Sequence, residues 1–273
     1  MRILVTNDDG IDAVGLYVLA RRLVDLGEVV VAAPDREYSG AGAALGTLHL
    51  IRPEVRRVEL PGVPEAWSAT GPPALCVMFA RLGVFGRPFD LVVSGINPGA
   101  NSGRAIYHSG TVGAALTARN GGVSGLAVSQ AVNDFGVEGQ GWDEMLDHQR
   151  WDTAAEIGAR VAQAMLDDLP LDPIVLNLNV PNRGLDELAG WRRTEVALLP
   201  TRTLAGATLI PKAGHDGAFD VQMDWGDPLV LPEDTDSGAV ESGYVAITAL
   251  SRILDDRSVD LTGVAAALDR AMP

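Results

Sequence analysis

Three short stretches of the sequence place oxygen-bearing side chains directly after apolar runs that are typical of buried strands. Residues 7–10 read Asn-Asp-Asp-Gly, residues 34–40 end in Tyr-Ser-Gly, and residues 94–103 hold two asparagines. The carboxyl ends of parallel strands meet at one edge of a sheet, which is where ligands bind. Carboxylate, hydroxyl and amide oxygens suit Mg²⁺ or Mn²⁺ and suit zinc poorly. We therefore expect a divalent-cation site at this edge, where the cation would also relieve the repulsion between Asp8 and Asp9.

A fourth stretch, residues 107–115, reads Tyr-His-Ser-Gly-Thr-Val-Gly-Ala-Ala and predicts a turn that leads into a helix of small residues. Backbone N–H groups and hydroxyls at a helix N-terminus bind anions, and phosphate is the usual occupant. A divalent cation beside such a site favours attack of water on a phosphoryl group. Lys212 is the only lysine and lies in no GxxxxGK phosphate loop, so the cation has to neutralise most of the phosphate charge.

The elements that must position these residues follow from the spacing of the apolar side chains. The sequence predicts strands at residues 3–6, 28–33, 89–93, 125–129 and 174–180, and helices at residues 14–26, 73–82, 111–119 and 151–166. A strand, a helix and a second strand within about 35 residues form a right-handed βαβ unit, which makes the sheet parallel. Beyond residue 181 we expect β-like runs at residues 195–199 and 243–250 and a helix at residues 261–272.

The predicted fold class is therefore α/β, with a doubly wound, Rossmann-like, mostly parallel sheet and a β-rich C-terminal extension. We divide the chain into an α/β catalytic core at residues 1–190 and an extension with a C-terminal helix at residues 191–273. The two parts can also count as one domain.

Composition and charge exclude several classes of protein. A chain that is 47% hydrophobic and 21% charged is not disordered, and Cys76, the only cysteine, allows no internal disulfide and no cysteine zinc site. Residues 131–273 hold 25 acidic and 10 basic side chains, whereas residues 1–130 hold 11 of each. The net charge of −15 thus lies wholly in the second part. It argues against nucleic-acid polymers and anionic membranes as partners but not against a small phosphate ester bound by the neutral first part.

The first nine residues contain two adjacent carboxylates where a secretory signal peptide needs an apolar core. No apolar run reaches the roughly 18 residues of a membrane-spanning helix. We expect a cytoplasmic protein without membrane association.

Six motifs follow one another from residue 3 to about residue 250. Because of these motifs together, the chain resembles the survival protein E (SurE) family of metal-dependent 5′/3′-nucleotidases. The motifs are Ile-Leu-Val-Thr-Asn-Asp-Asp-Gly, Ala-Pro-Asp-Arg-Glu-Tyr-Ser-Gly, Val-Ser-Gly-Ile-Asn-Pro-Gly-Ala-Asn, Tyr-His-Ser-Gly-Thr-Val-Gly-Ala-Ala, Leu-Asn-Leu-Asn-Val-Pro, and Thr-Asp followed by Gly-Tyr-Val-Ala-Ile-Thr.

The resemblance implies roles for particular residues. It implies one divalent cation per subunit, Mg²⁺ or Mn²⁺, held by Asp8, Asp9, Ser39 and Asn97. It also implies phosphate oxygens held by Asn101, Ser109, Gly110 and Thr111. Metal-activated water would then release phosphate from nucleoside 5′- and 3′-monophosphates, with Asp8 or Asp9 ligating the cation and taking the proton. The family commonly forms dimers or tetramers through its C-terminal extension, so the resemblance implies a homodimer or homotetramer.

Other functions stay open at this point. The chain departs from the family pattern at residues 42–46, which read Gly-Ala-Ala-Leu-Gly, and this leaves the substrate preference and the turnover open. The alternatives are a broad-specificity phosphatase or exopolyphosphatase and a nucleotide-binding regulatory protein without catalysis. A dinucleotide-binding oxidoreductase is disfavoured, because Leu45 takes the place of the third glycine of a G-x-G-x-x-G motif that follows the second strand rather than the first.

The single residues also allow plainer interpretations. Asp8 and Asp9 are common turn and helix-capping residues, Ser39 is a common loop hydroxyl, and Asn97 before a proline is a common turn residue. Their joint occurrence favours the metal site. His108 is either a surface or hydrogen-bonding residue or an acid for the leaving group, and we leave its role open.

Overall fold

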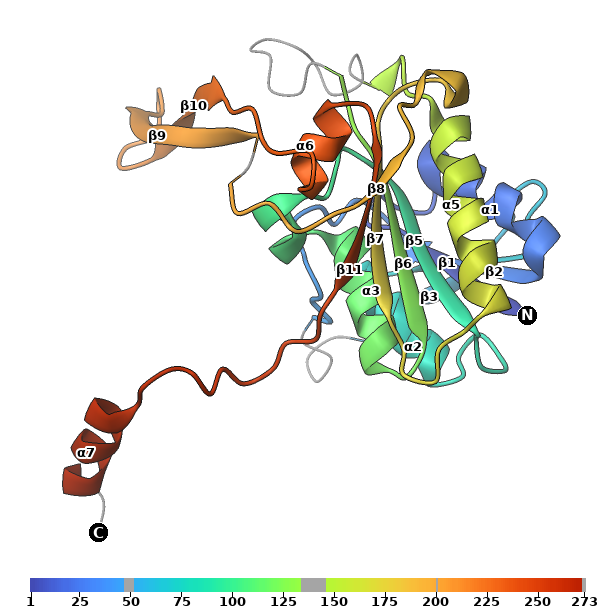
Figure 1. Ribbon diagram of the computed structural model, residues 1–273, viewed down its shortest axis with the longest axis horizontal. Coiled ribbons are helices and arrows are strands. Elements are labelled where there is room, and N and C mark those ends of the chain that lie inside the picture. The colour runs from blue at the N-terminus through green and yellow to red at the C-terminus, as the bar shows by residue number, and fades with distance from the viewer. Residues whose placement is uncertain (47–51, 134–145, 200, 272–273) are drawn as a thin grey trace.

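The computed structural model describes residues 1–46, 52–133, 146–199 and 201–271. In this part of the chain one nine-stranded sheet dominates, in the order β3-β4-β2-β1-β5-β6-β7-β11-β8 (Figure 1). A separate two-stranded sheet is formed by β9 and β10. The strands are β1 (Arg2–Thr6), β2 (Glu28–Pro34), β3 (Val55–Val58), β4 (Glu65–Ala69), β5 (Leu91–Pro98), β6 (Ser124–Gln130), β7 (Val175–Val180), β8 (Trp191–Arg193), β9 (Arg202–Pro211), β10 (Phe219–Pro228) and β11 (Val245–Leu250).

Helices cover both faces of the large sheet, as Figure 1 shows. α1 and α5 pack on one face, and α2 and α3 pack on the other. The helices are α1 (Val14–Leu23), α2 (Pro73–Arg81), α3 (Gly110–Asn120), α5 (Trp151–Asp167), α6 (Asp236–Glu241) and α7 (Thr262–Ala271), with short 3₁₀ helices η1 (Val24–Leu26), η2 (Gly103–Tyr107) and η3 (Leu185–Glu187). The predicted α/β fold with a mostly parallel sheet is confirmed.

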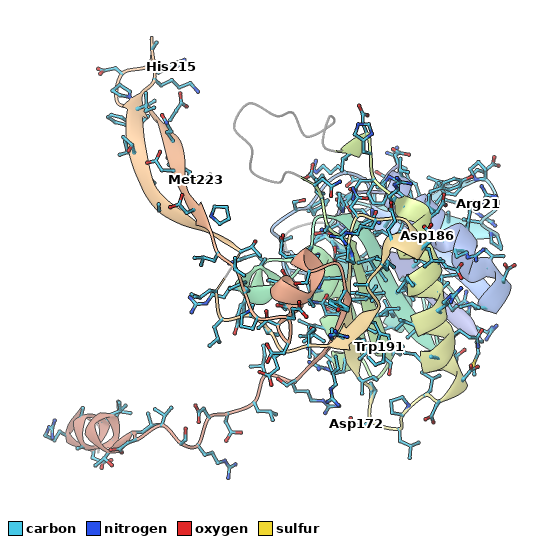
Figure 2. The ribbon with its side chains drawn as sticks, turned by 45° about the horizontal axis from the view of Figure 1, so that its top comes forward. Arg21, Asp172, Asp186, Trp191, His215 and Met223 are labelled. Atoms are coloured by element: carbon cyan, nitrogen blue, oxygen red, sulfur yellow. The ribbon has the colours of Figure 1, made fainter. Side chains whose placement is uncertain are left out.

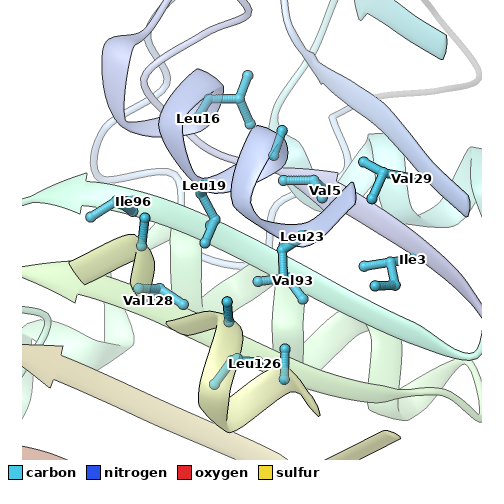
Figure 3. Packing of buried hydrophobic residues seen from close by; sticks show 14 of the residues in the cluster. Ile3, Val5, Leu16, Leu19, Leu23, Val29, Val93, Ile96, Leu126 and Val128 are labelled. Atoms are coloured by element: carbon cyan, nitrogen blue, oxygen red, sulfur yellow. The ribbon is translucent and has the colours of Figure 1, made fainter. Parts of the chain in front are cut away.

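Buried aliphatic side chains explain why the central strands and α1 form where they do. Leu16, Leu19 and Leu23 recur at helical spacing and point from α1 onto the sheet, where they meet β1 and β5 (Figure 3). The strand residues on both faces are buried, which is why β1 and β2 read as continuous apolar runs rather than alternating ones. This packing holds the carboxyl ends of the central strands in place.

The order in which successive strands are added to the sheet reverses at β1. From β1 the first βαβ unit leads through α1 to β2 on one side, with Arg2 beside Glu28, whereas β5 pairs with β1 on the other side. In an open α/β sheet, the crevice at such a switch point lies beyond the carboxyl ends of the two strands and is the usual ligand site. Residues 7–10 and 97–103, which follow β1 and end β5, therefore meet there.

Several predicted elements differ from the observed ones. Residues 195–199 form no strand, and only Glu195 makes a single bridge, to Thr235. β5 begins at Leu91 and runs on to Pro98, so the predicted strand at residues 89–93 is misplaced. Helix α1 ends at Leu23, and residues 24–26 form η1. The last helix ends at Ala271, and residue 272 lies outside the described part.

The C-terminal part leaves the body of the fold in two places. The hairpin of β9 and β10 projects away from the large sheet, with His215 near its tip, and α7 stands off at the end of an extended segment (Figure 2). Between these, β11 returns to the sheet and pairs antiparallel with β7 and parallel with β8. The division at residue 190 stays a prediction. Among the described residues no helix is both long and apolar enough to cross a membrane.

Candidate metal and phosphate site

The turn after β1 fixes the two adjacent aspartates at the switch point. The Asn7 side chain closes this turn, because its Nδ2 donates to the carbonyl of Gly10 at 3.0 Å and its Oδ1 accepts from the Gly10 N–H at 3.2 Å. Asn7 and Asp8 are buried, and Asp9 is partly buried. The aspartates are therefore held by a turn that does not use their own carboxylates.

Asp8 lies against the N-terminus of α3. Its Oδ2 accepts from the Gly110 N–H at 3.1 Å, and its Oδ1 accepts from the Thr111 hydroxyl. Burial raises the pKa of the Asp8 carboxyl, and these hydrogen bonds oppose that rise. Glycine at position 110 is needed for this approach, since a Cβ there would lie 2.7 Å from Oδ2 of Asp8. The helix N-terminus and Asp8 thus form one unit, with a negative charge where the helix dipole favours it.

Asn97, at the end of β5, presents an oxygen to the same place. Its Nδ2 donates to the carbonyl of Gly99 at 2.7 Å, which sets the orientation of the amide. Its Oδ1 lies 3.3 Å from the Thr111 hydroxyl, which shares its single hydrogen between this oxygen and the nearer Asp8 carboxylate. Because Thr111 also contacts Asp8, the ends of β1 and β5 and the start of α3 meet at this hydroxyl.

Asp9 is the least satisfied group in the site. Its Oδ2 is buried and has no hydrogen-bond partner among the described residues. Burial, together with the negative charges of Asp8 and Glu37, raises the pKa of the Asp9 carboxyl to about 8. A buried carboxylate oxygen without a donor requires either a proton or a cation.

The loop after β2 reaches the site through its backbone. The Tyr38 N–H donates to the carbonyl of Asp8 at 2.7 Å, and the Gly42 N–H donates to the carbonyl of His108 at 3.0 Å. Ser39 lies between these two contacts, and its exposed side chain makes no hydrogen bond among the described residues. Gly113 of α3 allows the loop to come this near, because a Cβ there would lie 2.3 Å from the Gly42 carbonyl.

Asn101 is buried beside this group and is held by β6 and β7. Its backbone N–H donates to Asn179 Oδ1 at 2.8 Å, and its carbonyl accepts from the side chains of Asn177 at 2.8 Å and Asn179 at 3.1 Å. Its Nδ2 donates to the Ser129 hydroxyl at 2.9 Å. An amide nitrogen carries two hydrogens, so one donor of Asn101 remains for another acceptor.

The comparisons with known proteins agree on one family. The family described as "Survival protein SurE" matches residues 3–201. The chain belongs to the SurE family. It is 35% identical over 95% of its length to 5′-nucleotidase SurE of Dehalococcoides mccartyi, of which it covers 92%. It is 36% identical over 97% of its length to 5′/3′-nucleotidase SurE of Serratia proteamaculans, of which it covers 93%.

A solved structure supports the same relationship. The crystal structure of the SurE protein from Aquifex aeolicus superposes with a TM-score of 0.78 at 27% identity, covering 98% of this chain and 100% of that one. The resemblance seen in the six sequence motifs is therefore confirmed, together with the fold class.

The predicted site residues of this SurE chain fall into two groups. The structure brings together Asp8, Asn97, Gly110 and Thr111 by direct hydrogen bonds. The other group adjoins them without such contacts. The Ser109 Oγ is occupied as the N-cap acceptor for the Val112 N–H at 3.1 Å, although its hydroxyl hydrogen remains available. The His108 side chain is exposed and contacts nothing among the described residues, so its role stays open.

Two further sets of residues support the site in ways that the sequence analysis did not predict. Asn177 and Asn179 lie two apart in β7, so both point to the same face and hold Asn101. Asp236 of α6 accepts from the Gly103 N–H at 2.9 Å. The role of Asn177 and Asn179 could be predicted from the sequence, because two asparagines in an otherwise apolar strand need buried partners. The contact of Asp236 could not be predicted, because α6 lies far from β5 in the chain.

The donor set fits a hard divalent cation. It combines two carboxylates, one of which has an unpartnered buried oxygen, with an amide oxygen whose orientation is set and a free hydroxyl. In the part of the chain that the structure describes, no three His, Cys, Asp or Glu side chains cluster, so amide and hydroxyl oxygens would have to complete the ligand set of the two aspartates. The chemistry of these donors favours Mg²⁺ or Mn²⁺ over zinc.

Proposed function

We propose that this chain is a metal-dependent phosphomonoesterase that releases phosphate from nucleoside 5′- and 3′-monophosphates. The observation that carries the proposal is the unpartnered, buried carboxylate oxygen of Asp9, which lies next to Asp8 at the switch point of the sheet. Such an oxygen, in a crevice that also holds the N-terminus of α3, supports a cation and a phosphate side by side.

The class of enzyme has support of a different kind. Membership of the SurE family and the relatives named 5′-nucleotidase and 5′/3′-nucleotidase confirm the prediction of a nucleotidase. The metal, the mechanism, the site residues and the choice between 5′ and 3′ substrates belong to the proposal.

In this proposal one divalent cation, Mg²⁺ or Mn²⁺, is held by Asp8, Asp9, Ser39 and Asn97. When bound, it supplies an activated water for attack on phosphorus and neutralises phosphate charge. Thr111 keeps the carboxylate of Asp8 and the amide oxygen of Asn97 turned toward each other. Either Asp8 or Asp9 takes the proton of the attacking water, and the burial of both carboxyls supports this role by raising their pKa values.

The phosphate is held by donors on the α3 side of the crevice. Asn101 offers its second amide hydrogen, and Ser109 offers its hydroxyl hydrogen. Gly110 and Thr111 bring the positive end of the helix dipole. In this proposal the cation and this helix end neutralise phosphate charge.

We also propose that two or more copies assemble through the C-terminal arm, here defined as the β9–β10 hairpin and residues 251–271. On one face of the hairpin, Leu209 lies opposite Val221 and Ala207 lies opposite Met223. Leu209, Val221 and Met223 are 63%, 60% and 55% exposed. An isolated two-stranded hairpin is marginally stable in water, so this apolar face needs a partner. A second copy of the chain, as a homodimer or within a homotetramer, satisfies that need.

Phosphate release from a panel of nucleoside 5′- and 3′-monophosphates tests the proposal, with Mg²⁺ or Mn²⁺ and with a chelator. We expect release that depends on the cation, with polyphosphate and simple phosphomonoesters as poorer substrates. Equal or faster release from polyphosphate or from every phosphomonoester would favour the broad-specificity alternative. Nucleotide binding without release would favour the regulatory one.

A further inference from the structure

The loop between β5 and α3 is held from two sides over three consecutive residues. On the sheet side, Asn177 and Asn179 of β7 and Ser129 of β6 hold both the backbone and the side chain of Asn101. On the other side lies α6, about 135 residues further along the chain, which Figure 1 shows near the same end of the sheet. The contacts of α6 with the loop begin at Ser102, the residue after Asn101, because the Ser237 hydroxyl donates to the Ser102 hydroxyl at 2.8 Å.

Asp236 is the centre of the α6 contact. Its side chain is completely buried, and its Oδ2 accepts from the Gly103 N–H at 2.9 Å. Its Oδ1 accepts from the N–H groups of Ala197 at 2.9 Å and of Ser237 at 2.8 Å. No basic side chain among the described residues pairs with it. A carboxylate is the only side chain that can accept all three bonds without presenting a donor.

The segment around Ala197 is itself fixed to α6. The Glu195 N–H donates to the carbonyl of Asp234 at 2.9 Å, and the Asp236 N–H donates to the carbonyl of Glu195 at 2.8 Å. Two pieces of the chain beyond β8 therefore converge on Gly103 through one carboxylate. This arrangement couples the C-terminal part of the chain to the loop that carries Asn101.

We propose that Asp236 is a positioning residue for the phosphate subsite: it holds the backbone at Gly103 and thereby sets the place of Asn101. The inference rests on the proposed function, because it takes Asn101 as a phosphate donor. Loss of the carboxylate would free residues 102 and 103 and weaken the contact of Asn101 with phosphate. Asp8 and Asn97 are held by other hydrogen bonds, and Asp9 lies in the turn that Asn7 closes, so these cation ligands would stay in place.

The test compares Asp236→Asn with Asp234→Asn, in which the same change is made at an exposed neighbour whose side chain makes no contact among the described residues. An amide at position 236 keeps the size but turns an N–H₂ toward one of three N–H donors. We expect KM for a nucleoside monophosphate and the inhibition constant of inorganic phosphate to rise about tenfold, as for residues that orient a ligand. We expect kcat and the affinity for Mn²⁺ to change less than about threefold, because binding rather than chemistry is affected.

Ser237→Ala is the second variant, since it removes only the hydroxyl that bonds Ser102 and remains informative if Asp236→Asn does not fold. It should raise KM about two- to threefold, in proportion to one neutral hydrogen bond.

The outcomes separate the two claims. A wild-type chain that releases phosphate, with normal KM and phosphate inhibition in the folded Asp236 and Ser237 variants, overturns the inference and leaves the proposed function standing. The inference is equally wrong if the affinity of the variants for Mn²⁺ falls as far as their KM rises. A wild-type chain that releases no phosphate overturns the proposed function and the inference with it.

Discussion

The switch-point site and the C-terminal arm differ in which side chains they bury: the site buries polar groups, and the arm exposes apolar ones. At the site, most polar groups are buried and partnered, whereas the buried Asp9 Oδ2 oxygen has no hydrogen-bond partner among the described residues. On the arm, apolar side chains such as Val221 and Leu209 are exposed and belong to none of the core clusters formed by the described residues. Each region therefore lacks one thing, and what it lacks indicates its ligand. Under the proposed function, the site would bind a cation and the arm would bind an apolar surface.

The difference also explains how each region can be altered. The site depends on the close approach of β1, β5 and α3, where one added carbon at Gly110 would lie 2.7 Å from the Asp8 carboxylate, so a single atom can disrupt it. The arm depends on apolar area, so single changes there act through association rather than through chemistry.

Asp8→Asn should lower kcat/KM for nucleoside monophosphates about 10³-fold, because it removes a proposed cation ligand and places an N–H₂ against the Gly110 N–H or the Thr111 hydroxyl. The measurement is phosphate release at saturating Mn²⁺. Asp12→Asn, at an exposed position without a side-chain contact among the described residues, is the matched control and should act as the wild type. Activity of the Asp8 variant within tenfold of the wild type would contradict the account.

Gly110→Ala should lower the same constant about 100-fold, because the added methyl group would lie 2.7 Å from the Asp8 carboxylate and push α3 away from it. Gly263→Ala in α7 is the control, since a Cβ there meets nothing within 4 Å. The control should leave activity unchanged and stabilise α7 slightly. If both alanine variants behave alike, the close approach of α3 to Asp8 has no catalytic consequence.

The metal-free chain should become less stable as the pH rises from about 4 to 8. Asp9 ionises near 3.8 when unfolded, whereas burial raises its pKa to about 8 in the fold, so the unfolded state binds fewer protons over this range. Asp9→Asn removes the penalty and should raise the free energy of unfolding at pH 8 by up to about 5 kcal/mol without metal. At pH 4 both forms should be equally stable. Denaturant unfolding in chelator at the two pH values measures this, and an equal effect at both would refute the assigned cause.

Val221→Asp should halve the mass of the assembly in solution while phosphate release changes less than about threefold, because the charge disrupts the apolar face of the hairpin. Light scattering after size-exclusion chromatography measures the mass. Gln222→Asp places the same charge on the opposite face of β10 and should keep the assembly intact. An unchanged mass for the Val221 variant would show that this face does not mediate association.

Much of the site could be predicted from the sequence because its residues follow strands in a local way. A buried strand that ends in Asn-Asp-Asp-Gly places Asp8 and Asp9 at the sheet edge without knowledge of any other element. Parallel order then brings Asn97 to the same edge, since β5 pairs with β1. The start of α3 can likewise be predicted from the Ser-Gly-Thr sequence at its N-terminus.

What the sequence did not reveal depends on contacts between distant segments or on unpartnered structure. Residues 195–199 alternate like a strand, but only Glu195 finds a partner there, because the neighbouring chain is the start of α6 rather than another strand. For the long hairpin the sequence predicts only β-rich structure, because both the apolar and the polar face of the hairpin are exposed to solvent. Asp236 resembles any helix-capping aspartate until the fold places Gly103 and Ala197 beside it.

Calorimetric titration of Mn²⁺ into the metal-free chain at pH 8 detects the proposed cation without reference to any substrate. We expect one site per chain in the wild type and loss of that site in both Asp8→Asn and Asp9→Asn. The Asp12→Asn control should bind as the wild type does. The absence of binding to the wild type, or unchanged binding in both aspartate variants, would show that the switch-point site does not hold the metal.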